Sequence, residues 1–367
     1  MILKPIQYMA IAIMLLLAAC GSEFDSRRAG LTPEEAYSGL LSGGIFSAIP
    51  EGPVYPADDP FSQAKASLGE MLFWDPLLSG DRDTACASCH HPEHEWADGR
   101  ALSIGVGGQG LGPNRIGHKL TPLHSPSVLN VAFVGLSGEP SPVFVSGPYF
   151  WDGRANTLEA QAIEPIKNEV EMRGSSYTED DILPEIINRL ERNAEYVTLF
   201  TLAFGTDVQI SEETIARALA AFQRRLITKP TRFDQFLNGD TSALSVAELE
   251  GLNTFIDVGC AACHNGPMLS DYAIDPTRPV IRDKPSVRTP SLRNIAKTAP
   301  YMHDGSKASL SDAIAFYEDR SDLEVTLDEG DVAPIEAFLK ALTDDAIYRE
   351  VPAQVPSGLA VGGDMNP

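Results

Sequence analysis

Two copies of one five-residue pattern carry the clearest chemistry in this sequence, Cys86-Ala87-Ser88-Cys89-His90 and Cys260-Ala261-Ala262-Cys263-His264. In the pattern Cys-x-x-Cys-His, two thiols form thioethers to a c-type haem and the histidine ligates its iron. A four-cysteine zinc site or two short disulfides would use the same thiols but leave both histidines without a role. The spacing therefore predicts two covalent haems. Their attachment residues are Cys86, Cys89, Cys260 and Cys263, and their iron ligands are His90 and His264.

The fifth cysteine, Cys20, ends an N-terminal apolar segment. Residues 1–19 carry one basic residue and an apolar run too short to span a bilayer as a stable helix, which predicts an export signal. The segment ends Leu17-Ala18-Ala19-Cys20 and resembles a bacterial lipobox, which implies lipidation of Cys20 after cleavage. An ordinary signal peptide with an incidental cysteine is the alternative. We expect a periplasm-facing protein that contacts the membrane only through its lipid. The resemblance favours the outer membrane over the inner one.

The composition limits the classes of partner. The 367 residues include 51 acidic and 28 basic residues, for a formal charge of -23. So acidic a chain is not expected to bind nucleic acid or an anionic membrane through bulk electrostatics, and it favours a cationic partner. The length suits two compact domains with enough chain for real cores.

Helix signals precede each Cys-x-x-Cys-His pattern and position it. Asp59-Pro60 predicts a helix start before the first pattern, because a capping residue is followed by proline at the first helical position. Ser245 and Glu248 form a capping box at the start of a helix that leads into the second pattern. Two further helices are predicted to start at Ser211 and at Ser309, and a last helix is predicted over residues 333–342. By analogy with small haem proteins, we expect an all-α fold of two cytochrome c-like haem domains with long loops.

The expected domain organisation follows from these helices and the segments between them. The signal over residues 1–19 precedes a flexible tether over 20–55, which is rich in Gly, Ser, Pro and charge. An N-terminal haem domain is expected over 56–232 and a C-terminal haem domain over 233–350, because the chain between them is polar and broken by proline. Residues 351–367 are expected to form a disordered tail.

Three further motifs give a resemblance to a known family. They are Tyr149-Phe150-Trp151-Asp152-Gly153-Arg154-Ala155 with Gln161, Pro165 and Glu171 after it, Thr289-Pro290-Ser291-Leu292-Arg293-Asn294, and Ala299-Pro300-Tyr301-Met302-His303-Asp304-Gly305. With the two haem patterns, they resemble the bacterial di-haem cytochrome c peroxidases and their MauG relatives over residues 60–348. The resemblance implies that the His90 haem, nearer the N-terminus, binds hydrogen peroxide. It also implies that Gln161 and Glu171 stand over its distal face and that Trp151 carries electrons between the haems.

A distal carboxylate is the group that peroxide cleavage requires. Heterolysis of the O–O bond moves a proton from the near to the far oxygen, and a carboxylate within hydrogen-bond reach relays it. Glu164, Glu169 and Glu171 compete for this role, and only the spacing from Trp151 favours Glu171. We expect the amide of Gln161 to hold the peroxide in place.

The sixth ligand of the second haem separates the branches of the family. In the family's peroxidases a methionine follows the histidine of the motif around His303 by fourteen residues, whereas this chain has Tyr317 there, as in MauG. A neutral thioether raises a haem potential, whereas an anionic phenolate stabilises oxidised iron. We expect Tyr317 to ligate the iron. A buried core tyrosine is the structural interpretation, and Met302 and Met268 are the alternative ligands.

Two further features of the family have weaker counterparts. The segment Ile116-Gly117-His118 resembles one whose histidine closes the peroxide-binding haem until the second haem is reduced, but the chain after it is two residues shorter than the family pattern. Thr298 and Pro300 match the carbonyl pair of a calcium site, but His124 replaces its asparagine. The shorter spacing leaves gating by His118 open. Imidazole is a poor calcium ligand, so the calcium ion is open as well.

Three functions are therefore considered, in order of preference. The first is a peroxidase that takes hydrogen peroxide at the N-terminal haem and electrons from a small donor cytochrome or cupredoxin through the C-terminal haem. The second is a MauG-like oxidase that modifies Trp or Tyr residues of a partner protein, which Tyr317 favours. The third, a non-catalytic electron-transfer cytochrome, is disfavoured by the pattern from Trp151 to Glu171.

Overall fold

The computed structural model describes residues 43–53, 55–136, 147–277, 280–281, 285–318 and 320–365. The predicted signal peptide, Cys20 and the first part of the predicted tether lie outside these residues. Within the described ranges, none of the helices combines the length and the apolar character needed to traverse a lipid bilayer.

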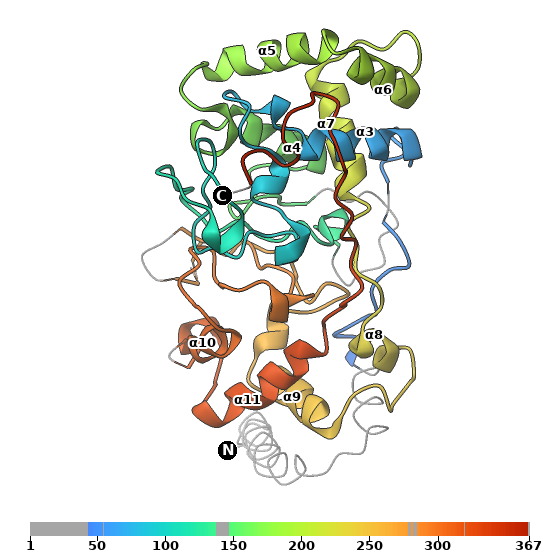
Figure 1. Ribbon diagram of the computed structural model, residues 1–367. Coiled ribbons are helices and arrows are strands. Elements are labelled where there is room, and N and C mark those ends of the chain that lie inside the picture. The colour runs from blue at the N-terminus through green and yellow to red at the C-terminus, as the bar shows by residue number, and fades with distance from the viewer. Residues whose placement is uncertain are drawn as a thin grey trace, which may run out of the picture.

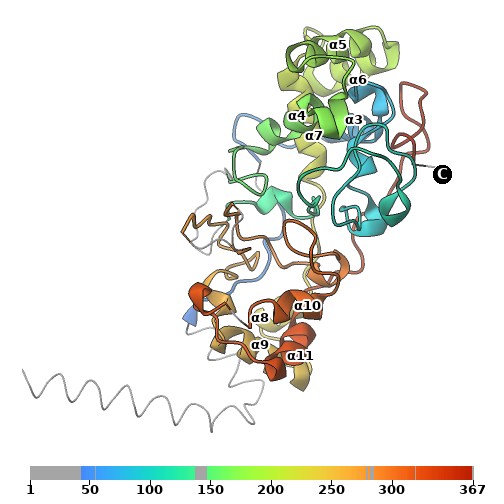
Figure 2. The ribbon, with the colours of Figure 1, turned by 90° about the vertical axis from the view of Figure 1, so that its left-hand side faces the viewer.

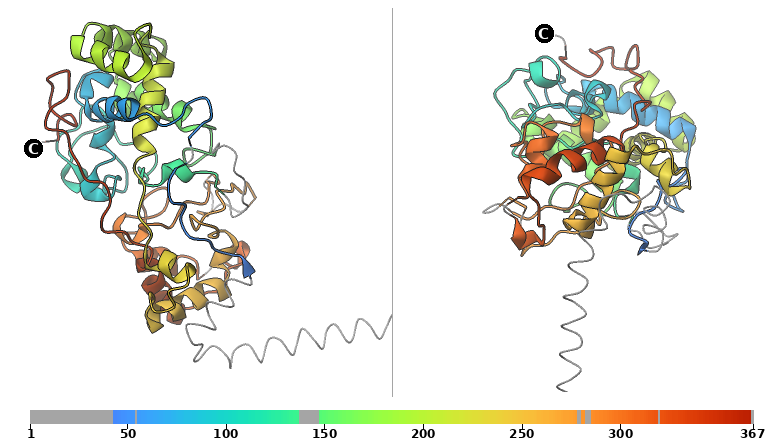
Figure 3. Two further views of the ribbon diagram at one scale, coloured as in Figure 1. Left: turned by 90° about the vertical axis from the view of Figure 1, so that its right-hand side faces the viewer. Right: turned by 90° about the horizontal axis from the view of Figure 1, so that it is seen from below.

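The described helices fall into two lobes. The α-helices are α3 (Gln63–Trp74), α4 (Leu158–Lys167), α5 (Glu179–Glu191), α6 (Ala194–Phe204), α7 (Glu212–Gln223), α8 (Arg232–Leu237), α9 (Val246–Asp257), α10 (Leu310–Ala315) and α11 (Glu329–Lys340). Short 3-10 turns are η1 (Pro76–Leu78), η2 (Cys86–Ser88), η3 (Pro92–His94), η4 (Gly112–Asn114), η5 (Val131–Phe133), η7 (Cys260–Ala262), η8 (Ile295–Lys297) and η9 (Ser321–Leu323), and η6 (Glu169–Arg173) is a π-helix. Helices α3 to α7 form the upper lobe in Figure 1 and α8 to α11 the lower one, a division also visible in Figures 2 and 3.

Long loops connect the helices, and the described residues pair in β fashion only at isolated bridges, such as Thr84 with Gly363. The prediction of an all-α fold with long loops is confirmed. The predicted caps are also observed, because Ser211, Ser245 and Ser309 are the N-cap residues of α7, α9 and α10.

Each lobe contains the same close helix pair. A Cβ atom on Gly69 of α3 would lie 1.8 Å from the carbonyl oxygen of Ala218 and 2.9 Å from Cβ of Phe222 in α7. A Cβ atom on Gly251 of α9 would lie 1.9 Å from the carbonyl oxygen of Pro334 and 3.0 Å from Cβ of Phe338 in α11. Only glycine permits backbones to approach so closely. In both lobes the glycine helix is also the one that leads into a Cys-x-x-Cys-His pattern.

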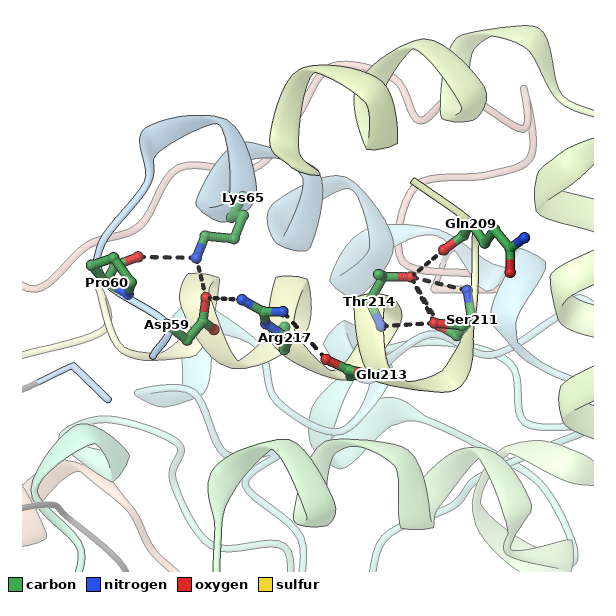
Figure 4. Close-up of polar contacts among 8 residues, drawn as sticks. All are labelled: Asp59, Pro60, Lys65, Gln209, Ser211, Glu213, Thr214 and Arg217. Atoms are coloured by element: carbon green, nitrogen blue, oxygen red, sulfur yellow. Dashed lines mark hydrogen bonds and ion pairs between the residues drawn. The ribbon is translucent and has the colours of Figure 1, made fainter. Parts of the chain in front are cut away.

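Helix α3 begins later than Asp59-Pro60 predicts. Its N-cap is Ser62, whose hydroxyl accepts a hydrogen bond from the Lys65 amide. Asp59 is nearly buried and binds two cations instead, Lys65 of α3 and Arg217 of α7, the latter at 2.8 Å (Figure 4). The acidic side chain thus ties α3 to α7 rather than capping a helix, a long-range role that a local cap signal does not reveal.

The predicted flexible tether is wrong for its last part, residues 43–53 and 55. Phe46 packs edge-on against Phe233 of α8 with ring centroids 5.5 Å apart, so the segment joins the core of the lower lobe. The Ile49 amide donates to the Asp234 carboxylate at 2.8 Å, and the Gly266 amide donates to the Ile45 carbonyl at the same distance. These partners lie far away in sequence, which is why the local composition suggested a linker.

The predicted disordered tail is also wrong for residues 351–365. The chain leaves the lower lobe and runs up along the upper one, where Val355 is buried (Figure 1). The Ser357 hydroxyl donates to Asp75 at 2.7 Å, and the Gly362 amide donates to the Trp74 carbonyl at 2.7 Å. The segment is ordered because its backbone groups find partners on α3 and on the loop that carries the first Cys-x-x-Cys-His pattern.

Candidate functional site

The first Cys-x-x-Cys-His pattern lies in the upper lobe, where η2 begins at Cys86. Cys89 Sγ lies 3.7 Å from the Ile104 carbonyl oxygen, and burial raises the pKa of both thiols to about 12. His90 Nδ1 lies 3.2 Å from the Trp96 carbonyl oxygen, an arrangement that places the proton on Nδ1 and leaves the Nε2 lone pair for a metal. Burial lowers the pKa of His90, which keeps the imidazole in the neutral, ligating form.

The second pattern lines a cavity of about 410 Å³, whose wall is formed mainly by the lower lobe and completed by residues between His124 and Trp151. Cys260, Cys263 and His264 all face this cavity, and His264 Nδ1 lies 3.0 Å from the Leu269 carbonyl oxygen, an arrangement that places the proton on Nδ1 and makes Nε2 the nitrogen that would ligate a metal. Apolar side chains make up much of the rest of the wall, including Phe255 of α9 and Leu310 of α10. Two thiols, one oriented imidazole and an apolar wall fit a c-type haem.

The zinc and disulfide alternatives find no support in the described chain. Among the described residues, no three His, Cys, Asp or Glu side chains are grouped so that they could hold a metal ion. Cys86, Cys89, Cys260 and Cys263 are free thiols. The donor chemistry of both patterns therefore fits haem attachment best.

Tyr317 follows α10 and lines the same cavity as His264. Burial raises the pKa of its phenol to about 12, the nearby Cys260 adds to this effect and Arg320 opposes it. Met302 also lines the cavity, whereas Met268 is fully buried in a separate cluster with Phe133 and other apolar residues. Of the three candidate sixth ligands, Tyr317 and Met302 thus face the cavity.

Glu171 lies in the π-helix η6, whose position is set by Asn168. Asn168 is the residue at which α4 ends and η6 begins. Its side-chain oxygen accepts hydrogen bonds from the backbone amides of Val170 and Glu171 at 2.9 and 3.3 Å. The Val106 amide donates to the Glu171 carbonyl at 2.9 Å, and a Cβ on Gly105 would lie 2.4 Å from the same oxygen. A π-helix is a rare element that often marks functional sites.

The environment of Glu171 suits a group that exchanges a proton near the first haem. Burial raises its pKa, the Arg154 guanidinium lowers it and the Glu164 carboxylate raises it. The charge of Glu171 in turn raises the pKa of the Cys86 and Cys89 thiols. The backbone of Glu171 lies near the first attachment site, because the Val106 amide donates to the Glu171 carbonyl and the Ile104 carbonyl oxygen lies 3.7 Å from Cys89 Sγ.

Gln161 lies on α4, one turn before Glu164. Residues three apart share a helix face, so Gln161 lies on the side of α4 whose Glu164 influences Glu171. Its side chain is half-buried, and among the described residues the side-chain amide makes no hydrogen bond. This side-chain amide is therefore free to bind a ligand.

Trp151 lies between the two sites. Its Nε1 donates to the His124 carbonyl at 2.9 Å, its ring centroid is 6.2 Å from that of His303, and it lines the second cavity. The next residue after His124, Ser125, has its hydroxyl 3.4 Å from His90 Nε2. One hydrogen bond from Trp151 therefore reaches the segment that contacts the ligand of the first site.

The predicted gating and calcium residues have less support. His118 is exposed on a loop of the upper lobe. Thr298 and Pro300 line the second cavity together with His124, but His124 Nδ1 already lies 2.8 Å from the Arg100 carbonyl oxygen. Gating by His118 and calcium at Thr298 and Pro300 stay predictions.

Three residues of the site were not identified from the sequence. Asn168 and Gly105 position Glu171, and Arg288 lies in the wall of the second cavity, where its Nε donates to the Phe150 carbonyl at 2.8 Å. Arg288 directly precedes the motif that starts at Thr289, and that position was the available signal. The other two act through backbone geometry, which no motif records.

Known proteins are similar to this chain over most of its length. Residues 63–242 match a family model described as di-haem cytochrome c peroxidase. The chain is 32% identical to the methylamine utilization protein MauG of Methylophilus methylotrophus, across 81% of this chain and 88% of that protein. It is also 32% identical to a cytochrome c551 peroxidase of Nitrosomonas europaea, across 87% of this chain and 91% of that protein.

Solved structures agree with these relatives. A MauG-like protein associated with microbial copper homeostasis superposes with a TM-score of 0.65 at 30% identity, covering 81% of this chain and 95% of that one. The diheme peroxidase BthA of Burkholderia thailandensis superposes with a TM-score of 0.60 at 21% identity, covering 88% of this chain and 99% of that one, and shares the fold.

Proposed function

The chain belongs to the di-haem cytochrome c peroxidase and MauG family, and from that premise we propose that it reduces hydrogen peroxide at the His90 site. The observation that carries this proposal is the partly buried Glu171, which residues 104–106 hold near the first attachment site. A pure electron-transfer cytochrome would have no use for a partly buried acid near one haem.

When bound, a c-type haem supplies iron that binds peroxide and takes up its oxidising equivalents. Glu171 accepts the proton of the near peroxide oxygen and returns it to the far oxygen, which leaves as water. Its raised pKa brings the carboxyl closer to the working pH, so that the same group can accept the proton in the first step and release it in the second. The Gln161 amide orients the peroxide, while the Trp96 carbonyl holds His90 in its ligating tautomer.

Electrons reach this site from the second cavity. Trp151 lines that cavity and is hydrogen-bonded to the segment beside His90, which makes it the natural relay. The donor is proposed to be a small cytochrome or cupredoxin with a basic face, since a chain of net charge -23 attracts cations. We further propose that lipidated Cys20 holds the enzyme at a periplasm-facing membrane surface.

A second candidate is a MauG-like oxidase of protein Trp or Tyr residues. Tyr317 supports it, because a phenolate in the cavity that His264 also lines would stabilise oxidised iron if it ligated the haem there. On this hypothesis, peroxide converts the diferric protein into a long-lived oxidised species without prior reduction, and Tyr317→Met abolishes that species. The peroxidase hypothesis requires turnover with a reduced small cytochrome.

The proposal is tested by Glu171→Gln, assayed for peroxide reduction with a reduced small cytochrome after confirming full haem content. Turnover is expected to be lost. Glu169→Gln is the matched control, because Glu169 lies two residues away in the same π-helix but is exposed and pairs with Lys119 at 3.4 Å. Wild-type turnover in Glu171→Gln would overturn the assignment of the acid.

A further inference from the structure

A tryptophan and a tyrosine stack on each other beside His90, the expected iron ligand of the first site. The rings of Trp96 and Tyr348 lie 6.3 Å apart at an interplanar angle of 19°. The Trp96 indole Nε1 donates to the Tyr348 backbone carbonyl at 2.8 Å, which fixes the pair. Trp96 is fully buried, whereas Tyr348 is partly exposed.

The buried end of this pair touches the haem ligand. The Trp96 carbonyl oxygen is the partner of His90 Nδ1 at 3.2 Å. The other rings around Trp96 are Phe73 and Phe222, which are hard to oxidise, and Trp74, which is fully buried and meets Trp96 edge-on with centroids 6.4 Å apart. Tyr348 is therefore the oxidisable ring that stacks on Trp96 and leads toward the surface. A continuous sequence of contacts thus runs from His90 through Trp96 to Tyr348.

The outer end of the pair is built to release a proton. The Tyr348 hydroxyl donates to Glu70 at 2.6 Å and lies 3.1 Å from Glu350, which is exposed. The Arg225 guanidinium lies 5.5 Å from the centre of the Tyr348 ring and disfavours a positive charge on it. Loss of an electron from Tyr348 must therefore be accompanied by loss of its proton, and Glu70 is placed to accept it.

We propose that Trp96 and Tyr348 form a one-electron path from the His90 site to the surface, where Tyr348 oxidises small phenols. This inference rests on the proposed function, which supplies hydrogen peroxide as the oxidant. Tyr348 passes one electron through Trp96 to the peroxide-oxidised site and its phenolic proton to Glu70, and becomes a neutral tyrosyl radical. A phenol then returns one electron to Tyr348, Glu70 returns the proton to the Tyr348 oxygen, and the phenol releases its own proton to the solvent, so that a phenoxyl radical leaves and Glu70 is again ionised.

Phenols fit this site because they give up the same electron and proton that Tyr348 loses. They are also neutral, so the acidity of the chain does not repel them. A peroxide-driven activity at the surface would act on molecules too large to enter a haem pocket.

The test uses diferric holoprotein mixed with hydrogen peroxide without a donor, frozen at short times and measured by EPR. We expect a tyrosyl signal that narrows when the protein carries ring-deuterated tyrosine and that is lost in Tyr348→Phe. Trp96→Phe, with its haem content verified, is expected to lose the same signal. Tyr177→Phe is the matched control, because the Tyr177 ring centre lies 5.4 Å from the Arg189 guanidinium carbon and does not stack on a tryptophan.

Guaiacol serves as the phenol in a second measurement. Peroxide-driven oxidation of guaiacol is expected to fall in Tyr348→Phe, while turnover with a reduced small cytochrome is kept. A full tyrosyl signal or unchanged guaiacol oxidation in Tyr348→Phe overturns the path. If wild-type protein consumes peroxide and forms no tyrosyl radical, the path alone fails. If it does not consume peroxide, the proposed function fails with it.

Discussion

Cys89 and Glu171 contact the same short backbone segment. Cys89 Sγ lies 3.7 Å from the Ile104 carbonyl oxygen, and two residues later the Val106 amide donates to the Glu171 carbonyl at 2.9 Å. The distance between the haem attachment site and the proposed acid is therefore set by residues 104–106. Gly105, between them, has no room for a side chain, since a Cβ would lie 2.1 Å from the Val170 carbonyl oxygen.

Substitution of Gly105 by alanine should therefore displace Glu171. The clash is with backbone atoms, which yield less readily than a flexible side chain, and overpacking of this kind costs about 1–3 kcal/mol. We expect Gly105→Ala to lower peroxide turnover strongly and the free energy of unfolding modestly, as measured by steady-state kinetics and urea denaturation. Gly52→Ala is the control, because a Cβ there meets nothing within 4 Å. Unchanged turnover in Gly105→Ala would show that Glu171 does not need this segment.

The pH dependence of turnover should move in opposite directions in two variants. Burial raises the pKa of Glu171, the Arg154 cation lowers it and the Glu164 carboxylate raises it. Removing the cation in Arg154→Met should raise this pKa and shift the acidic limb of kcat/KM to higher pH, because the base form must accept the first proton. Glu164→Gln should shift the limb to lower pH. Shifts of the same sign in both variants would assign the limb to another group.

Local signals in the sequence predicted the parts of this fold that depend on neighbouring residues. The Cys-x-x-Cys-His patterns and the caps at Ser211 and Ser245 each need only a few adjacent residues. By contrast, Ser88 within the first pattern donates to the Gly362 carbonyl at 2.7 Å, a contact across 274 positions. Nothing in the composition of residues 351–367 indicates that partner, so the segment looked disordered.

The residues of the candidate site also divide into those that a local motif identifies and those that depend on contacts distant in sequence. Trp151 and Glu171 were identified through motifs, and their expected roles stay predictions. Asn168 was missed because its contribution is to end α4 and start a π-helix, and this depends on how the backbone meets residues 105 and 106. Residues that act through the position of another residue's backbone leave no motif of their own.

A buried ion pair should govern the stability of the lower lobe. Arg293 donates two hydrogen bonds of 2.8 Å to Asp234, both side chains are fully buried, and Asp234 also accepts from the Ile49 amide. Removing one partner leaves a buried charge unpaired, which costs about 3–5 kcal/mol. We expect Arg293→Met to lower the free energy of unfolding by this order in urea denaturation. Lys297→Met is the control, since its pair with Asp345 is exposed.

The same pair predicts a dependence on pH. Burial alone would raise the pKa of Asp234, but hydrogen bonds and charge from Arg293 outweigh it and hold the pKa below its ordinary value. The stability from ionised Asp234 is therefore present above the unfolded-state pKa and is lost as the pH falls through the folded-state value. The difference in unfolding free energy between wild type and Asp234→Asn should shrink over this acidic range. A constant difference would mean that Asp234 is not ionised in the folded protein.

Replacement of Tyr317 should change the potential of the second haem. Tyr317 faces the cavity that holds His264, and burial raises its pKa to about 12, so the free phenol stays protonated at neutral pH. Binding to ferric iron would release that proton, since metal ligation favours the deprotonated ligand. Because the resulting phenolate stabilises oxidised iron, we expect Tyr317→Met to raise the reduction potential in spectroelectrochemical titration. Met302→Leu, which alters the other candidate in the cavity, should leave the potential unchanged. The opposite pattern, with Met302→Leu lowering the potential and Tyr317→Met leaving it unaltered, would assign the sixth ligand to the thioether and remove the main support for the MauG-like hypothesis.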